Sequence, residues 1–128
     1  MDEKKILVVD DEESIRELYQ SILGEKGYIV ETAESGEQAL ELLEKQNVQV
    51  MYLDLNLPGM DGLELARQIR KLKPIAILYA FTGYSSVFEL LNCREAGFDD
   101  YFKKPMNIET VLESAEDAFK KIDRWSRR

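Results

Sequence analysis

The chain has 128 residues, of which 45% are hydrophobic, so it can fold as one domain around its own core. Its 25 acidic and 17 basic residues give a net charge of −8, which disfavours binding to nucleic-acid phosphates. A single cysteine and the absence of histidine exclude a disulfide framework, zinc sites on paired cysteines and catalysis by an imidazole.

The first apolar run, residues 6–9, has no polar alternation, which predicts a strand buried on both faces. It ends at the acidic pair Asp10-Asp11. Apolar residues with helical spacing follow at Ile15, Leu18, Tyr19 and Ile22. Gly24 and Gly27 are predicted to end this helix, which completes a first strand–helix unit.

The second unit begins with a predicted strand over residues 28–33. Ser35 and Gln38 have the spacing of a capping box, which predicts a helix start. The core face of that helix is expected to carry Ala39, Leu40, Leu42 and Leu43. Residues 48–55 are predicted to form the third strand, followed by a loop rich in proline, glycine and aspartate.

Asp61 is positioned to cap the third helix, with apolar positions at Leu65, Ile69 and Leu72. Residues 75–81 are predicted to be the fourth strand. Ser85 or Ser86 can begin the fourth helix, and Gly97 ends it. Apolar residues of that helix are Val87, Leu90 and Leu91, and Cys93 is expected to be a small packing residue.

The last unit has a short predicted strand over residues 98–103, bounded by Pro105. Asn107 is expected to cap the final helix. Its apolar positions are Ile108, Val111, Leu112, Ala115, Phe119 and Ile122. Five apolar strands alternating with amphipathic helices predict an α/β fold, a parallel sheet covered by helices on both faces. Ligands of such doubly wound sheets bind beyond the carboxyl ends of the strands.

The expected strand ends carry Asp10, Asp11, Asp54, Thr82 and Lys104. Taken singly, the Asp10-Asp11 pair fits a helix-capping turn and Lys104 fits an ordinary surface lysine. Taken together, the carboxylates would repel one another unless a cation lay among them, and oxygen ligands favour Mg²⁺. A carboxylate, a divalent ion, a lysine and a hydroxyl are the parts needed to transfer a phosphoryl group onto the carboxylate.

Three motifs resemble the receiver domain of two-component response regulators, the family that includes chemotaxis regulators. They are Ile6-Leu-Val-Val-Asp-Asp-Glu12, Leu53-Asp-Leu-Asn-Leu-Pro-Gly-Met-Asp-Gly62 and Asp99-Asp-Tyr-Phe-Lys-Lys-Pro105. The resemblance implies a flavodoxin-like (βα)5 three-layer sandwich with a five-stranded parallel sheet of order 2-1-3-4-5. It also implies a single receiver domain over residues 1–128, with a core at about 4–122 and a C-terminal tail at 123–128.

The same resemblance assigns roles to individual residues. Asp54 matches the phosphorylated aspartate, and Lys104 matches the lysine that bonds the phosphoryl group. Asp11 matches the direct Mg²⁺ ligand and Asp10 the ligand that often binds through water, with Mn²⁺ as a second candidate metal. Asn56 matches the position whose backbone carbonyl completes the metal shell.

The switch hydroxyl can be read as Thr82 or as Tyr79. Thr82 lies 28 residues after Asp54 and 22 before Lys104, separations typical of the family, and the small Gly83 follows it. We therefore assign the switch to Thr82 and expect Tyr79 to be a core residue. Tyr101 matches the aromatic residue whose rotamer follows activation.

Two positions are expected to set the lifetime of the phosphorylated state. Asn56 and Tyr84 lie two residues after Asp54 and Thr82, where family side chains flank the path of the hydrolytic water. A bulky Tyr84 can shield the phosphoryl group, or it can be a half-exposed loop aromatic without this role.

The expected function is that of a phosphoacceptor, a self-modifying switch rather than an enzyme with a separate substrate. A haloacid-dehalogenase-type phosphatase is the alternative, but such enzymes carry a second Asp where this chain has Asn56. A receiver-like interaction module that never carries phosphate is a further alternative. A flavin-binding domain would need a Ser/Thr/Gly phosphate loop after the first strand, where this chain is acidic.

The expected partners are a histidine kinase or histidine phosphotransfer domain, and a downstream protein target or fused output domain. No direct nucleic-acid or membrane partner is expected. The N-terminus lacks the pattern of a signal peptide, so a cytoplasmic location is expected. The kinase, the pathway, the oligomeric state, the lifetime of the phosphorylated state and the full length of the protein stay open.

Overall fold

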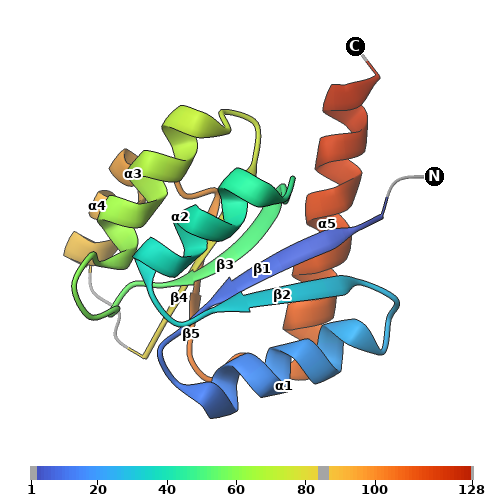
Figure 1. Ribbon diagram of the computed structural model, residues 1–128, viewed down its shortest axis with the longest axis horizontal. Coiled ribbons are helices and arrows are strands. Elements are labelled where there is room, and N and C mark those ends of the chain that lie inside the picture. The colour runs from blue at the N-terminus through green and yellow to red at the C-terminus, as the bar shows by residue number, and fades with distance from the viewer. Residues whose placement is uncertain (1–2, 84–86, 128) are drawn as a thin grey trace.

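Strands and helices alternate along the whole of the computed structural model, which describes residues 3–83 and 87–127 (Figure 1). Within those ranges the elements are β1 (Lys5–Val9), α1 (Glu13–Gly24), β2 (Ile29–Ala33), α2 (Gly36–Lys45), β3 (Val50–Asp54), α3 (Gly62–Leu72), β4 (Ile77–Thr82), α4 (Val87–Ala96), β5 (Asp100–Lys103) and α5 (Ile108–Ser126). The predicted alternation is confirmed.

The strands form one parallel sheet with the order β2-β1-β3-β4-β5. β2 therefore lies on one side of β1, and β3, β4 and β5 follow in order on the other side. The direction in which successive strands are added reverses between β1 and β3, which leaves a crevice beyond the carboxyl ends of these two strands. The register pairs Val9 with Leu53 and Asp54 with Phe81, so the predicted site residues emerge at the same edge.

Helices cover both faces of the sheet. Figure 1 shows α2, α3 and α4 on one face and α1 and α5 on the other. Alternate residues of a strand serve opposite cores, as the pleat requires. Leu7 and Val9 of β1 belong to the core beneath α2, α3 and α4, whereas Ile6 and Val8 belong to the core beneath α1 and α5. The three-layer arrangement that the sequence predicts is confirmed.

The helix starts follow the predicted capping residues. Asp61 Oδ1 accepts from the Glu64 N–H at 2.9 Å, and Asn107 Oδ1 accepts from the Thr110 N–H at 2.7 Å. Ser35 Oγ accepts from the Gln38 N–H at 3.1 Å, but the Gln38 side chain accepts from the Glu34 N–H instead of closing the box on Ser35. In the predicted capping box, the Gln38 side chain therefore binds the N–H of Glu34, one residue before the N-cap Ser35.

Several boundaries differ from the sequence prediction. The strands predicted at 28–33, 48–55, 75–81 and 98–103 begin later, at Ile29, Val50, Ile77 and Asp100, because their first residues lie in the preceding loops. The proposed tail at 123–128 is helical as far as Ser126. The candidate helix starts Ser85 and Ser86 lie outside the described residues.

Some apolar positions assigned to helix core faces are exposed to solvent. Leu72, Leu90, Leu91 and Ile108 have exposed fractions of 66%, 44%, 58% and 57%. Leu72 is the last residue of α3 and Ile108 is the first residue of α5. On α4 the small residues Cys93 and Ala96 pack against the core, which confirms the packing role predicted for Cys93. Among the described residues, no helix combines the length and apolarity needed to cross a bilayer.

Candidate functional site

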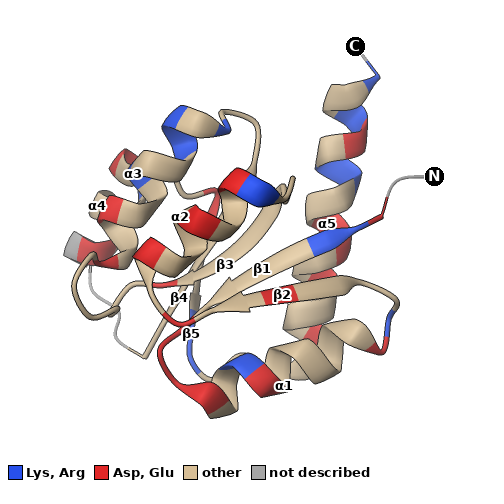
Figure 2. Ribbon diagram, in the orientation of Figure 1, with Lys and Arg blue, Asp and Glu red and all other residues tan. Residues whose placement is uncertain are grey.

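The carboxyl ends of four strands converge on one small site. Asp10 follows β1, Asp54 ends β3, Thr82 ends β4 and Lys104 follows β5. Figure 2 shows acidic residues along the loop from β1 to α1, at this edge of the sheet. The parallel topology explains the convergence, because residues up to 94 positions apart leave the sheet on the same side.

Lys104 bridges two buried carboxylates at this site. Its Nζ lies 2.6 Å from Asp10 Oδ2 and 3.3 Å from Asp54 Oδ2. The two aspartates have exposed fractions of only 0% and 4%. Lys104 Nζ also lies 4.9 Å from the centre of the Phe81 ring, which adds a cation–π contact. The ammonium group is therefore held beside both carboxylates.

Burial and charge act against each other at this site. Burial raises the pKa of the Asp54 carboxyl, while the Asn56 N–H and the Lys104 charge oppose that increase. Burial alone would lower the pKa of Lys104, but its contacts with Asp10 and Asp54 outweigh this effect and raise the pKa above its usual value. Lys104 stays a cation at neutral pH, so it can pair with a further anion.

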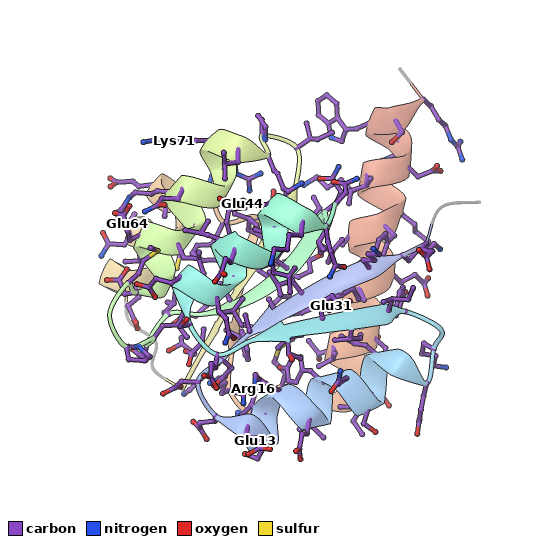
Figure 3. The ribbon with its side chains drawn as sticks, in the orientation of Figure 1. Glu13, Arg16, Glu31, Glu44, Glu64 and Lys71 are labelled. Carbon is purple, nitrogen blue, oxygen red and sulfur yellow. The ribbon has the colours of Figure 1, made fainter. Side chains whose placement is uncertain are left out.

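Main-chain contacts hold the acidic loop in position. Asp10 Oδ1 accepts from the Glu12 N–H at 2.8 Å, and the Asp10 carbonyl accepts from Arg16 Nη1 at 2.8 Å. Arg16 Nη2 lies 3.7 Å from Glu34 Oε2 in the loop after β2. In Figure 3, Arg16 lies on the side of α1 toward the sheet and Glu13 on the outer side. The sequence analysis missed Arg16, because nothing in its spacing indicates a contact with Asp10.

Gly62 allows α3 to approach the end of β3 closely. Its N–H donates to the Leu55 carbonyl at 3.1 Å. A Cβ at this position would overlap the Asp54 carbonyl oxygen and would lie 2.7 Å from the Leu55 Cα. Only glycine fits this close backbone approach. The sequence analysis placed Gly62 in a turn and missed this role.

Thr82 lies at the site, and Tyr79 does not. Thr82 is fully buried, and its Oγ1 accepts a hydrogen bond of 3.2 Å from the Asn56 Nδ2 group. Tyr79 is a core residue with 6% of its surface exposed, and its hydroxyl donates to the Ser114 carbonyl at 2.8 Å. This confirms the core position predicted for Tyr79.

Tyr101 lies on β5 and is partly buried. Burial raises the pKa of its hydroxyl, and so do the nearby Glu89 carboxylate and a hydrogen bond to it. The ring is thus connected to the first turn of α4. Tyr84, for which the sequence leaves open a shielding role or a half-exposed loop position, lies outside the described residues.

The acidic residues of the site fit a hard divalent cation. Asp10, Asp11 and Asp54 each offer a carboxylate oxygen, and these oxygens lie within 4.8 Å of one another. Asp10 and Asp54 are buried and Asp11 is exposed, so the set lies at the surface with an open side. Carboxylates without nitrogen or sulfur ligands are the donors that Mg²⁺ prefers. Asn56, whose carbonyl was expected to join this set, lies two residues after the end of β3, and its N–H donates to Asp54 Oδ1 at 3.1 Å.

Residues 6–116 match the family model of the response regulator receiver domain. This chain belongs to that family. The receiver is 42% identical over 108 residues to the alkaline phosphatase synthesis transcriptional regulatory protein PhoP of Bacillus subtilis, a match that covers 84% of the receiver and 45% of PhoP. The receiver spans 28% to 50% of the length of the curated relatives that it matches.

Solved structures have the same fold as the receiver. A CheY-like receiver domain protein of Methanospirillum hungatei is 31% identical, with a TM-score of 0.90 and coverage of 99% of the receiver and 100% of that chain. A response regulator from Burkholderia pseudomallei, solved with a phosphorylated aspartic acid, a calcium ion and citrate, is 30% identical. Its TM-score is 0.81, and the match covers 92% of the receiver and 75% of that chain.

Proposed function

We propose that this receiver accepts a phosphoryl group on Asp54 from the phosphohistidine of a histidine kinase or histidine phosphotransfer domain, in the cytoplasm. The observation that carries the proposal is the position of Asp54. Its carboxylate is buried at a strand end, within 3.3 Å of Lys104 Nζ and grouped with Asp10 and Asp11. The phosphorylated aspartate reported for the Burkholderia pseudomallei protein supports the same chemistry here.

In the proposed transfer, a carboxylate oxygen of Asp54 attacks the phosphorus atom as the bond from phosphorus to the histidine nitrogen breaks. The other ring nitrogen of the phosphohistidine carries a proton, so the departing nitrogen keeps the bonding pair and the ring leaves as neutral imidazole. Lys104 stabilises the charge on the phosphoryl oxygens, and the Thr82 hydroxyl donates to one of them. Asp10, Asp11, Asp54 and the Asn56 carbonyl would hold Mg²⁺ or Mn²⁺, which would neutralise negative charge on the phosphoryl group.

The acyl phosphate is a temporary signal in this proposal. Phosphorylation adds charge and acceptor oxygens at one point, and Thr82 and Tyr101 respond by moving toward the site. Their movement shifts the α4-β5-α5 surface between two states, and a downstream protein or a fused output domain reads that surface. Water then removes the phosphoryl group, at a rate influenced by Asn56 and Tyr84. The receiver thus modifies itself and turns over no separate substrate.

Intact-protein mass spectrometry tests the proposal directly. Incubation with Mg²⁺ and phosphoramidate is expected to add the mass of one phosphoryl group to the wild-type protein and none to Asp54→Asn. Asp123→Asn, which removes an exposed carboxylate on α5, is the matched control and is expected to label like the wild type. Equal labelling of Asp54→Asn would reject Asp54 as the acceptor, and omission of Mg²⁺ should abolish labelling.

A further inference from the structure

A hollow of about 500 Å³ lies beside the proposed phosphoacceptor. It is lined by Asp11, which belongs to the same acidic group as Asp54, and by Asn56, whose N–H donates to Asp54 Oδ1. Its floor is apolar, with Leu55 and Leu57 each only 6% exposed. A planar ring could rest on this floor.

The rim of the hollow carries negative charge. Asp61 and Glu89 contribute carboxylates that lie outside the proposed metal-binding group, and among the described residues no lysine or arginine lines the hollow. Asp61 is exposed at the start of α3, and Glu89 is half-buried in the first turn of α4. Lys104, the cation of the neighbouring site, lies against Asp10 and Asp54. The electrostatic potential in the hollow therefore disfavours an anion and favours a cation.

We infer that this hollow receives the leaving group of the phosphodonor, and that Asp61 and Glu89 determine which donors react. They select donors that release a neutral nitrogen base and disfavour acyl phosphates, which release a carboxylate. This inference rests on the proposed phosphoacceptor function of Asp54. It assigns the two acidic residues a role in specificity, distinct from binding a metal.

The two donor classes differ in the charge that they bring into the hollow. Phosphoramidate carries a protonated nitrogen; as the bond from Asp54 oxygen to phosphorus forms, the phosphorus–nitrogen bond breaks and ammonia leaves with the bonding pair. Protonated phosphohistidine likewise releases neutral imidazole. Acetyl phosphate breaks a phosphorus–oxygen bond, and acetate leaves with the pair and a full negative charge. Asp61 and Glu89 attract the protonated nitrogen of the first donor class and repel the carboxylate that the second class releases.

The rates of Asp54 phosphorylation by acetyl phosphate and by phosphoramidate test the inference. Both are measured by intact mass spectrometry at the same Mg²⁺ concentration and ionic strength. Glu89→Gln and Asp61→Asn are each expected to raise the acetyl phosphate rate about fivefold, with no gain for phosphoramidate. Gln at position 89 still accepts a hydrogen bond from Tyr101, and Asn at position 61 still caps α3.

Glu64→Gln is the matched control. It removes the same charge from the exposed side of α3, where Figure 3 shows Glu64 directed outward, and Glu64 does not line the hollow. Its ratio of the two rates should equal that of the wild type. In the wild type, added KCl should raise the acetyl phosphate rate relative to the phosphoramidate rate, because salt screens the repulsion. This second measurement does not depend on how well the variants fold.

The inference would be overturned if the ratio of the acetyl phosphate rate to the phosphoramidate rate were unchanged in Glu89→Gln and Asp61→Asn. It would also be overturned if that ratio in the wild type did not depend on salt. An equal change in Glu64→Gln would also overturn it, because the effect would then belong to net charge and not to the hollow. Failure of both donors to label Asp54 would instead reject the proposed function. The two failures are therefore distinguishable.

Discussion

The side-chain amide of Asn56 donates a 3.2 Å hydrogen bond to the hydroxyl of Thr82. The bond joins the loop after β3 to the end of β4, across 26 residues of sequence. It connects the position proposed to influence dephosphorylation with the hydroxyl proposed to move on phosphorylation. In the unphosphorylated protein, Asn56 therefore restrains the Thr82 side chain.

A double-mutant cycle measures this restraint. Asn56→Ala and Thr82→Val are expected to show a coupling free energy of about 0.5–1 kcal/mol, the usual net contribution of one hydrogen bond. Urea denaturation of the wild type, both single variants and the double variant provides the four values. The cycle cancels other contacts of Thr82. Additive effects on the free energy of unfolding would show that the bond contributes nothing to stability.

Neutralising Asp54, the proposed phosphoacceptor, is expected to stabilise the fold. Burial raises the pKa of Asp54, which means that its charged form is disfavoured in the folded state. Asp54→Asn should therefore raise the free energy of unfolding by on the order of 1 kcal/mol at neutral pH in EDTA. Lys104 keeps Asp10 as its ionic partner in this variant.

Magnesium provides the complementary measurement for the same variant. Mg²⁺ should raise the melting temperature of the wild type, because a ligand that binds only the folded state stabilises it. The increase should be smaller in Asp54→Asn, which has lost one carboxylate of the acidic group. The prediction would be wrong if Mg²⁺ shifted both proteins equally.

Gly62→Ala is expected to damage both stability and phosphorylation. The new Cβ would overlap the Asp54 carbonyl, so α3 or the end of β3 must shift. We expect a loss of roughly 2–4 kcal/mol in the free energy of unfolding and slower labelling of Asp54. Gly24→Ala is the matched control, because nothing lies within 4 Å of its Cβ at the end of α1. That control should be stabilised by up to about 1 kcal/mol.

Cys93 is expected to react slowly in the folded protein. Burial first, and the Glu89 carboxylate second, raise the pKa of its thiol from 9.0 to about 11. At pH 8 the folded thiol is protonated as well as buried, so iodoacetamide should label it much more slowly than in urea. Equal labelling rates in the folded and unfolded protein would contradict the buried position.

The same thiol predicts a pH dependence of stability. The folded-state pKa lies above the unfolded value, so the contribution of Cys93 is fully present below pH 9 and is lost as the pH rises to about 11. The wild type should therefore lose more stability than Cys93→Ala between pH 9 and pH 10. Buried tyrosines with raised pKa values are present in both proteins, so their contribution cancels in this comparison.

Local signals in the sequence predict much of this fold. The apolar run at residues 6–9 and the caps Asp61 and Asn107 depend on the chain within a few residues, and each forms as expected. The charged residues at the strand ends also follow from local pattern, because parallel strands all end at the same edge. The sequence alone therefore places Asp10, Asp54, Thr82 and Lys104 at the carboxyl edge of the sheet.

The tertiary structure alone decided the contacts between distant segments. Lys104 reaches Asp10 across 94 residues because the loops after β5 and β1 open at the same sheet edge. Gly62 is needed only because α3 packs onto the backbone of Asp54. Leu90 and Leu91 have helical apolar spacing yet remain exposed, because α4 packs through Cys93 and Ala96 instead. Periodicity identifies the residues of a helix, whereas burial is decided by the surface on which that helix packs.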